Sequence, residues 1–396
     1  MVRVLLVEDS EDDAELLRRA LREDPFDIAH VESVTAAAAA LHEKPFDVVL
    51  LDLSLPDSQG FESFLKIRTH AHEAAIIVLT GLDDETLGLK TVQAGAQDFV
   101  VKGTLSGPLM MRAIRHALER KRAEAVTLEY ARALAARNEQ MREDLQLARE
   151  VQQAFLPSRC PDFPIGSASP SLQFVHRYVP AGAVGGDFFD VFPLAPEVAG
   201  IIVCDVMGHG VRAALVTALL RAMVGPAAAS AHDPSAMLTD LNERLRQILR
   251  GCDSVLFVTA AYLVVNAVTG EVRMANAGHP KPARVPLSLS AAAAASEPYP
   301  IGPPLGLVET PKYETHRFQL TAGERLLLFT DGVYEVEGPG GETFGQARLQ
   351  NLLQSQSSLG AEPFLDTVLE KVRAHAVDGE FTDDACLLAI DFRRSA

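Results

Sequence analysis

Short apolar runs alternate with helix-like stretches over the first 120 residues of the chain. Four runs predict buried parallel strands, at 4–7, 48–51, 76–79 and 99–101. Between them lie stretches with helical spacing of apolar residues, at 14–21, 36–41, 61–68 and 86–94. This alternation predicts a doubly wound α/β domain, in which the ligand site lies at the carboxyl ends of the strands.

The stretch from 109 to 155 contains no proline or glycine, and its apolar residues are spaced by three and four. One helical phase holds Met141, Leu145, Ala148 and Phe155, with Gln152 filling the gap. A second phase holds Ile114, Leu118, Ala125 and Leu128, and the shift between them near 131–134 resembles a stutter. We predict one long helix, stopped by Pro157, with a weak coiled-coil seam that joins two chains in parallel. The alternative is a helix lying on a neighbouring domain of its own chain.

The second half of the chain is rich in strand-like runs. We expect strands at 201–203, 257–265, 272–275 and 326–329, and helices at 213–224 and 234–249. Strands and helices in separate runs predict an α+β layered domain. An alanine- and serine-rich stretch at 288–296 is typical of a surface loop.

Composition narrows the classes of function. The net charge of −17 over 396 residues argues against a nucleic-acid-binding protein, because recognition of a phosphate backbone needs clustered lysine and arginine. The chain starts without a signal-peptide pattern, and no apolar run approaches the roughly 18 residues of a membrane helix. The 4 cysteines are scattered, so we expect neither disulfides nor structural zinc, and a cytoplasmic location.

Residue types that bind magnesium and phosphate follow the expected strands of the first domain. Glu8 and Asp9 follow the first strand, Asp52 the second, Thr80 ends the third, and Lys102 follows the last. Three carboxylates suit a magnesium ion, whereas a hydroxyl and an ammonium group suit phosphoryl oxygens. Each residue alone is more often an ordinary loop or surface residue. Their recurrence at successive strand ends predicts one site.

These segments resemble the response-regulator receiver domain, over about the first 120 residues. The matching motifs are VED at 7–9, LDLSLPDSQG at 51–60, LTG at 79–81 and GAQDFVVK at 95–102. The resemblance implies a flavodoxin-like fold in which Asp52 accepts a phosphoryl group from a sensor histidine kinase. It also implies one Mg²⁺ ion, whose ligands would be Asp9 as the main one, Glu8, Asp52 and Ser54.

The same resemblance implies a switch. Thr80 would move toward the acyl phosphate, Lys102 would contact it, and Phe99 would be the switching aromatic residue. Gly103 stands where the family usually has proline. The cis peptide that is usual at this position is therefore open to question.

Four aspartate-centred motifs lie in the second half, GGDFFD at 185–190, DVMGHG at 205–210, TDGV at 330–333 and TDD at 382–384. Each places a carboxylate at the end of an apolar run or beside glycine, where the backbone can turn tightly. No cysteine or histidine cluster accompanies them, and oxygen ligands suit Mg²⁺ or Mn²⁺. If the aspartates converge, two cations about 4 Å apart could activate water and stabilise an in-line displacement at phosphorus.

Other interpretations of these motifs are available. Each aspartate alone is more often a turn or cap residue, and we expect Asp190 to be one. As a set they could hold a structural calcium ion, although no EF-hand spacing is present. Covalent catalysis by Cys204 or Cys386 is disfavoured, because both lie in strand-like runs where a buried thiol is inert.

The aspartate motifs resemble the metal-dependent protein phosphatases of the PPM family, in the SpoIIE-like and RsbU-like bacterial branch. Other matching segments are REVQQAFLP at 149–157, NAGHP at 276–280, GPPLG at 302–306 and FG at 344–345. The resemblance implies two Mn²⁺ or Mg²⁺ ions bridged by Asp205, with the Val206 carbonyl on one of them. Asp187 would hold the second metal, and Asp331 and Asp383 would hold the first.

Some assignments within this resemblance stay open. Asp384, next to Asp383, could be the fourth ligand instead. Cys386 replaces the usual threonine, which would affect packing more than chemistry. His209 could protonate the serine or threonine leaving group, or simply lie beside a helix start. The segment 276–280 is expected to be a structural turn.

We therefore predict a receiver domain at 1–120, a helical coiled-coil linker at 121–157 and a phosphatase domain at 158–396 with an α-β-β-α sandwich. The expected function is a serine/threonine protein phosphatase controlled by phosphorylation of Asp52. By analogy with the family, its substrate would be a phosphorylated anti-sigma-factor antagonist. The alternatives are a phosphorylation-gated interaction protein that uses the phosphatase fold as a binding platform, and a phosphatase of small phosphate esters.

Overall fold

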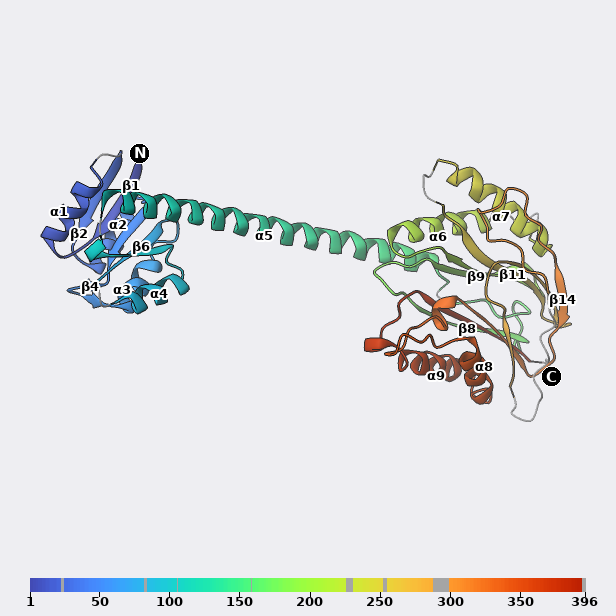
Figure 1. Cartoon of the computed structure of the whole chain (residues 1–396). Helices are drawn as coiled ribbons and strands as arrows, with labels where there is room; N and C mark the ends of the chain where they lie inside the picture. Colours follow the sequence, from blue (N-terminus) through green and yellow to red (C-terminus); the bar gives the residue numbers. More distant parts are fainter. Residues whose placement is uncertain are drawn as a thin grey trace. The chain divides into compact units, whose positions relative to one another are not determined.

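The chain folds into two compact units, Met1–Glu139 and Gln140–Ala396 (Figure 1). The structure is a computed structural model that describes residues 1–22, 25–81, 84–104, 106–157, 159–225, 231–251, 255–287 and 299–393. The alanine- and serine-rich stretch at 288–296 lies outside the described residues. Among the described helices, none is both long and apolar enough to cross a membrane.

The first unit contains a five-stranded sheet, one strand more than the four predicted from the sequence. The strand order is β2-β1-β3-β6-β7, and every neighbouring pair is parallel. The strands are β1 (Val2–Val7), β2 (Phe26–Val31), β3 (Val48–Asp52), β6 (Ala75–Thr80) and β7 (Asp98–Val101), and a short hairpin of β4 (Ser54–Leu55) and β5 (Ser58–Gln59) follows β3. Strand β2 was not expected, because it is a half-buried edge strand whose apolar pattern is interrupted by Asp27 and His30.

Helices cover both faces of this sheet. They are α1 (Glu11–Ala20), α2 (Val34–Glu43), α3 (Phe61–Arg68) and α4 (Glu85–Gln93). Helix α1 and the start of α5 bury their apolar residues on one face, and α2, α3 and α4 bury theirs on the other. Two of these helices begin at a serine cap, where Ser10 accepts from Asp13 N at 3.4 Å and Ser33 accepts from Ala36 N at 3.2 Å.

Helix α5 (Gly107–Phe155) is one continuous helix of 49 residues, and its ends belong to different units. Its apolar residues behave differently along its length. Ile114 is buried in the first unit, whereas Leu128 and Met141 are 52% and 62% exposed. Gln152, which fills a gap in the apolar pattern, is buried in the second unit. The coiled-coil seam therefore stays a prediction, and Gln152 is excluded from it.

The second unit contains two antiparallel sheets. One has the order β14-β12-β11-β10-β9 and the other has the order β13-β15-β16-β8. The strands are β8 (Leu172–Val179), β9 (Asp187–Ala195), β10 (Val198–Val206), β11 (Val258–Asn266), β12 (Glu271–Ala277), β13 (Ala283–Pro286), β14 (His316–Gln319), β15 (Glu324–Phe329) and β16 (Ala385–Phe392). The helices are α6 (Val211–Val224), α7 (Pro234–Leu249), α8 (Gln346–Ser355) and α9 (Ala361–Arg373).

The two sheets of this unit face each other, and each carries helices on its outer face. One buried cluster joins the sheets, with Val203 and Leu263 from the first sheet against Leu328 and Leu388 from the second. A second cluster packs α6 and α7 on the first sheet, and a third packs α8 and α9 on the other. This layering leaves the strand ends near 187, 205, 331 and 383 as the place where several chain segments meet.

Candidate active site and receiver site

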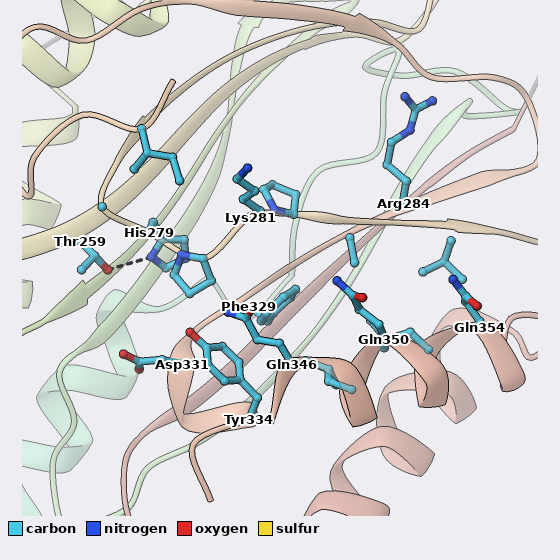
Figure 2. A pocket seen from close by; sticks show the side chains of 18 residues that line it. Thr259, His279, Lys281, Arg284, Phe329, Asp331, Tyr334, Gln346, Gln350 and Gln354 are labelled. Carbon is cyan, nitrogen blue, oxygen red and sulfur yellow. Dashed lines mark hydrogen bonds between the residues drawn. The ribbon is translucent and has the colours of Figure 1, made fainter. Parts of the chain in front are cut away.

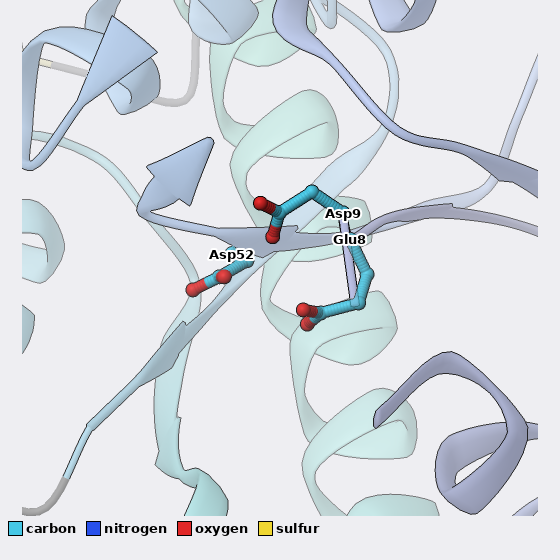
Figure 3. Close-up of side chains that lie close together, drawn as sticks. All are labelled: Glu8, Asp9 and Asp52. Carbon is cyan, nitrogen blue, oxygen red and sulfur yellow. The ribbon is translucent and has the colours of Figure 1, made fainter. Parts of the chain in front are cut away.

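In the first unit, three carboxylates meet at the carboxyl ends of β1 and β3 (Figure 3). The ligand atoms of Glu8, Asp9 and Asp52 all lie within 4.8 Å of one another, and within the described part of the chain no other trio of acidic, histidine or cysteine side chains is so close. Glu8 and Asp52 are buried, and Asp9 is exposed. The strand ends thus assemble an oxygen-rich site that suits a hard divalent cation.

The Lys102 ammonium group neutralises part of this charge. Its Nζ lies 2.7 Å from Glu8 Oε2, 3.0 Å from Asp52 Oδ2 and 3.1 Å from Asp13 Oδ2. Burial raises the pKa of Glu8, with Asp52 adding to the rise and Lys102 opposing it. Burial lowers the pKa of Lys102, but its bonds to Glu8 and Asp52 outweigh burial and raise that pKa overall. The receiver site therefore contains a cation of its own.

The other predicted receiver residues surround this site in different ways. Thr80 is buried at the end of β6, and its hydroxyl has no hydrogen-bond partner among the described residues. Phe99 is half-buried in β7, and its ring lies so close to Gly88 of α4 that a Cβ there would overlap it. Ser54 is exposed in β4. The peptide between Lys102 and Gly103 is trans, since the described cis bond is Phe163–Pro164.

In the second unit, two predicted aspartates lie on neighbouring strands. Asp187 begins β9, Asp205 lies next to the end of β10, and the two are directly opposite in the antiparallel register. Like charges in this position destabilise a sheet unless something neutralises them. Burial raises the pKa of Asp187 well above its ordinary value, and the charge of Asp205 raises it further.

The other two predicted aspartates come from the second sheet. Asp331 follows β15, and Asp383 precedes β16. Burial, followed by the charges of Asp331 and Asp383, raises the pKa of Asp205 to about 7. Burial and Asp383 also raise the pKa of Asp331. In the described part of the chain, none of the four forms an ion pair with lysine or arginine, so their repulsion is uncompensated by protein groups.

Asp384, the alternative to Asp383, is engaged by the backbone. Its Oδ1 accepts a hydrogen bond from Ala181 N at 2.8 Å, and its Oδ2 accepts one from Gly186 N. Burial raises its pKa, although these two N–H groups oppose the rise. Asp383 accepts from Asp384 N at 2.8 Å through Oδ1 alone, so its Oδ2 is the more available oxygen.

Glycine is required in these motifs because neighbouring segments approach its backbone too closely to leave room for a Cβ atom. A Cβ on Gly186 would lie 2.9 Å from the carbonyl oxygen of Val206, the expected carbonyl ligand. A Cβ on Gly185 would overlap Tyr178 and Asp384, and a Cβ on Gly332 would overlap the backbone of Asp384. These contacts link all four motifs, because strands from both sheets can approach this closely only where side chains are missing.

Thr330 connects the two sheets through its hydroxyl group. Oγ1 donates to Asp187 Oδ2 at 2.6 Å and accepts from Cys386 N at 2.9 Å. The Cys386 side chain is buried, and burial, then Asp187, raises the pKa of its thiol well above the ordinary value. Burial raises the pKa of the Cys204 thiol as well. Both thiols therefore stay protonated, which agrees with the expectation that neither is a nucleophile.

The remaining predicted residues have distinct positions. His209 is exposed in the turn between β10 and α6, close enough to Asp384 to interact with it electrostatically. The segment 276–280 forms a turn, as expected, in which Asn276 Oδ1 accepts from His279 N at 2.8 Å and Nδ2 donates to His279 O at 2.9 Å. The expectation for Asp190 was wrong. It is buried within β9 rather than in a turn or cap, and it pairs with Arg221 of α6.

Three neighbours of the site were not found from the sequence. Glu335 lies one turn beyond Asp331, and its charge helps to raise the pKa of Asp205. Tyr178 of β8 has a buried hydroxyl beside Asp384. Gln152 of α5 accepts from Gly185 N at 3.0 Å and donates to Gly185 O at 2.6 Å. Glu335 carried a signal in its spacing of four from Asp331, and Gln152 carried one as the polar residue in an apolar helical phase. Tyr178 carried none, because its contact with Asp384 is distant in sequence.

The donor set of the second unit fits divalent metal ions. Buried carboxylates that repel one another, with no lysine or arginine paired to them among the described residues, are stabilised by bound cations. Their oxygens are the ligands that Mg²⁺ and Mn²⁺ prefer. A phosphohydrolase that uses metal ions is therefore the class of enzyme that this fold and donor set indicate.

Comparisons with known proteins agree with this class. The family model for the "Response regulator receiver domain" matches residues 4–115, and the model for "Stage II sporulation protein E (SpoIIE)" matches residues 196–393. The chain therefore belongs to the SpoIIE phosphatase family and carries a receiver domain.

Individual relatives are more distant. Protein IcfG of Synechocystis sp. is 26% identical over 272 residues, which cover 62% of this chain and 41% of IcfG. Phosphoserine phosphatase RsbP of Bacillus subtilis is 24% identical over 251 residues, which cover 63% of this chain and 58% of RsbP. The chain thus spans about half the length of these relatives. Among solved structures, the SiaA-PP2C domain of Pseudomonas aeruginosa is 23% identical to this chain, with a TM-score of 0.56. The match covers 66% of this chain and 100% of that domain, and it shows that the two share a fold.

Proposed function

We propose that this response regulator is a metal-dependent serine/threonine protein phosphatase whose activity is controlled by phosphorylation of Asp52. The observation that carries the proposal is the facing pair Asp187 and Asp205, joined by Asp331 and near Asp383, without a paired lysine or arginine among the described residues. A cluster of repelling carboxylates at rigid strand ends is suited to catalytic cations. RsbP, a phosphoserine phosphatase by name, supports the choice of substrate class.

The proposed metal ligands follow from the donor positions. Asp205 would be shared by two Mn²⁺ or Mg²⁺ ions, and the Val206 carbonyl would bind one of them. Asp331 and Asp383 would hold the first ion, and Asp187 would hold the second. When bound, such ions activate water and neutralise charge that develops on a phosphoryl group. The two backbone hydrogen bonds of Asp384 support Asp383 as the fourth ligand, because a carboxylate already engaged at both oxygens is less available.

The chain's own residues would perform the remaining work. Thr330 holds the Asp187 carboxylate in one orientation by its 2.6 Å hydrogen bond. His209, exposed near Asp384, would donate a proton to the serine or threonine oxygen as it leaves. In the receiver, Asp52 would accept the phosphoryl group from a sensor histidine kinase, with one Mg²⁺ held by Asp9, Glu8 and Ser54. Thr80, Phe99 and Lys102 would respond to that phosphoryl group.

The substrate and the assembly are part of the same proposal. We expect the substrate to be a phosphorylated anti-sigma-factor antagonist, as the family resemblance implies. The exposed apolar residues of α5, such as Leu128 and Met141, support a homodimer formed through this helix. Phosphorylation of the receiver would then act on the phosphatase through α5, which contributes to both units.

The test uses the full chain, a phosphoserine peptide and Mn²⁺, with and without beryllofluoride as a mimic of phosphorylated Asp52. We expect metal-dependent hydrolysis that beryllofluoride changes, and a mass in solution of two chains. Hydrolysis should vanish in the variant Asp205→Ala with Asp331→Ala. A matched control is Asp240→Ala, which removes a carboxylate of α7 that pairs with Arg244 at 2.9 Å. Hydrolysis that survives the double substitution would contradict the two-metal assignment.

A further inference from the structure

A groove leads away from the aspartates of the second unit, between β13 and α8 (Figure 2). Its volume is about 770 Å³, and Asp331 lines one end. His279 and Tyr334 also lie at this end, and the rest of the groove follows α8. The groove is therefore continuous with the proposed catalytic site.

One wall of the groove is a row of amide side chains. Gln346, Gln350 and Gln354 are spaced by four along α8, so they share one face of the helix, the face that lines the groove. All three are exposed, and the side chains of Gln350 and Gln354 have no hydrogen-bond partner among the described residues. The apolar floor beneath them is made by the buried Leu349 and Leu353. An amide group both donates and accepts, so this wall can bind a polypeptide backbone irrespective of its sequence.

The opposite wall is the edge of a sheet, to which no strand of the described residues pairs. β13 pairs with β15 and is the end strand of its sheet. Leu287 N donates to Gly323 O, which continues the register of the β13–β15 pair. In an antiparallel ladder the bonded pairs alternate, so residues 283 and 285 bond to β15, whereas the N–H and C=O groups of Arg284 point to the open edge.

The prolines of this segment agree with that alternation. Pro282 and Pro286 occupy the two other outward positions, where no N–H group is needed by the sheet. The edge thus offers one N–H donor, from Arg284, and three carbonyl acceptors, from Pro282, Arg284 and Pro286. The guanidinium group of Arg284 points away from α8 and is occupied by Glu324 at 2.6 Å, so it leaves the edge free.

A cation lies near the catalytic end of the groove. Lys281 is exposed and lines the groove, and its Nζ lies 5.0 Å from the centre of the Tyr299 ring. Among the described residues it forms no ion pair with a carboxylate. In a chain of net charge −17, an unpaired lysine beside a phosphate-processing site favours an acidic group in the bound molecule.

We propose that this groove binds an extended segment of the phosphoprotein substrate, next to its phosphorylated residue. The segment would add to the edge of β13, donate backbone N–H groups to its three carbonyls, hydrogen-bond the amides of Gln350 and Gln354, and place an acidic side chain at Lys281. From Gln346 to Gln354 the helix rises roughly 12 Å, which matches about four residues of extended chain. This inference rests on the proposed phosphatase function and names how its substrate is held.

The experiment compares two substrates on the full chain with Mn²⁺. One is a peptide in which a phosphoserine is flanked on each side by five residues, one of them acidic. The other is p-nitrophenyl phosphate, which has no polypeptide chain to fill the groove. The readout is the kcat/KM value for the peptide divided by the kcat/KM value for p-nitrophenyl phosphate. For Gln350→Glu with Gln354→Glu, which keeps size and helix propensity, we expect this ratio to fall about tenfold through KM of the peptide. Lys281→Met should lower it about fivefold.

A control places one new negative charge elsewhere on α8, where the double glutamine variant adds two. Asn351→Asp changes an exposed amide that does not line the groove, and the ratio should stay at the wild-type value. Peptides N-methylated at alternate backbone amides give a second readout. One alternate set should raise KM and the other should leave it unchanged, because only every second N–H of an added strand faces the edge.

The outcomes separate the groove from the catalytic proposal. If both substrates are hydrolysed but neither the groove variants nor N-methylation change the ratio, the groove is not the substrate site, while the phosphatase function stands. If Asn351→Asp lowers the ratio as much as the glutamine variants, general charge rather than the groove is responsible, and the inference is overturned. If the wild-type chain hydrolyses neither substrate, the proposed function fails and the inference fails with it.

Discussion

Both units gather carboxylates at the ends of β-strands, but only the receiver site pairs them with a lysine. Lys102 Nζ lies 2.7 Å from Glu8 and 3.0 Å from Asp52. In the second unit Asp187 and Asp205 face each other across two strands, and within the described residues neither forms an ion pair. The receiver site therefore holds one cation of its own against several carboxylates, whereas the described part of the phosphatase site pairs none with its aspartates.

The difference explains how each site relates to its ligand. A lysine beside Asp52 can donate hydrogen bonds to the oxygens of an added phosphoryl group, which suits a switch. A site of uncompensated carboxylates is stable only when cations are bound or protons are taken up, so that metal binding and folding are coupled there. The predictions below test this contrast, starting with the largest expected effect.

The pair Asp383 and Asp384 separates metal binding from support of the backbone. We expect Asp383→Asn to reduce phosphoserine-peptide hydrolysis by more than the ~10–100-fold that is typical of residues that only support a ligand. Asp384→Asn should instead lower the free energy of unfolding by about 2 kcal/mol, because a charged acceptor of two N–H groups is weakened. Kinetics with saturating Mn²⁺ and denaturant titrations measure the two effects. The reverse pattern would make Asp384 the ligand.

Removing the lysine should make the receiver site resemble the phosphatase site. Lys102→Met leaves Glu8 buried without its cation. In Mg²⁺-free buffer this should lower the free energy of unfolding of the first unit by about 3 kcal/mol. Mg²⁺ should restore more stability to this variant than to the wild type. Amide hydrogen exchange of β1 and β3 measures both values.

The control for this variant is Lys66→Met, which breaks an exposed pair with Glu62 at 2.8 Å and should cost less than about 0.5 kcal/mol. If the Lys102 variant is no less stable than this control, the lysine does not stabilise the carboxylates of the site.

Thr330→Val should show that the carboxylates of the second unit depend on orientation as well as on charge. The substitution keeps the shape of the side chain but removes the donor to Asp187 and the acceptor of Cys386 N. We expect kcat/KM for the phosphoserine peptide to fall about 30-fold, with Mn²⁺ affinity falling in parallel. Thr330→Ser should recover most of the loss. Equal activity of the valine and serine variants would show that the hydroxyl has no such role.

The smallest expected effect is the response of metal-free protein to pH. Asp205, with a pKa raised to about 7, binds more protons folded than unfolded between its ordinary pKa and 7. The stability that this protonation contributes is complete below the ordinary pKa and is lost as pH rises through about 7. With a chelator present, the free energy of unfolding of the second unit should fall by about 1 kcal/mol between pH 6 and pH 8. Mn²⁺ should remove the loss, whereas a stability that rises over this interval would contradict the assignment.

The fold could be predicted where the hydrophobic pattern was continuous. Strands β1, β3, β6 and β7 lie near the expected runs, because buried parallel strands are apolar throughout. Strands β8, β13 and β14 were missed, since they are short or half-buried strands whose polar residues hide the pattern. Strand β9 was missed because Asp190, inside it, was expected to lie in a turn or cap. Helices α8 and α9 were missed although they are amphipathic. Their apolar residues do follow helical spacing, but no helix was predicted between the aspartate motifs at 330–333 and 382–384.

The sites could be predicted as far as local motifs reach. Aspartates next to glycine at strand ends pointed to 187, 205, 331 and 383, and the structure brings the segments that carry them together. The hydrogen bonds of Thr330 and Gln152 were out of reach, because each joins residues more than 30 positions apart. The buried position of Asp190 was mistaken for the same reason, since its partner Arg221 lies on another element.

The crowded glycines at 185, 186 and 332 have a consequence for how this sequence can vary. At each of them, atoms of at least one other segment of the chain already fill the space of a Cβ. In a library of every single substitution, these three positions should accept no replacement, not even alanine, while the exposed surface of α5 accepts many. A selection for activity would therefore reveal the meeting point of the two sheets as three positions where only glycine survives.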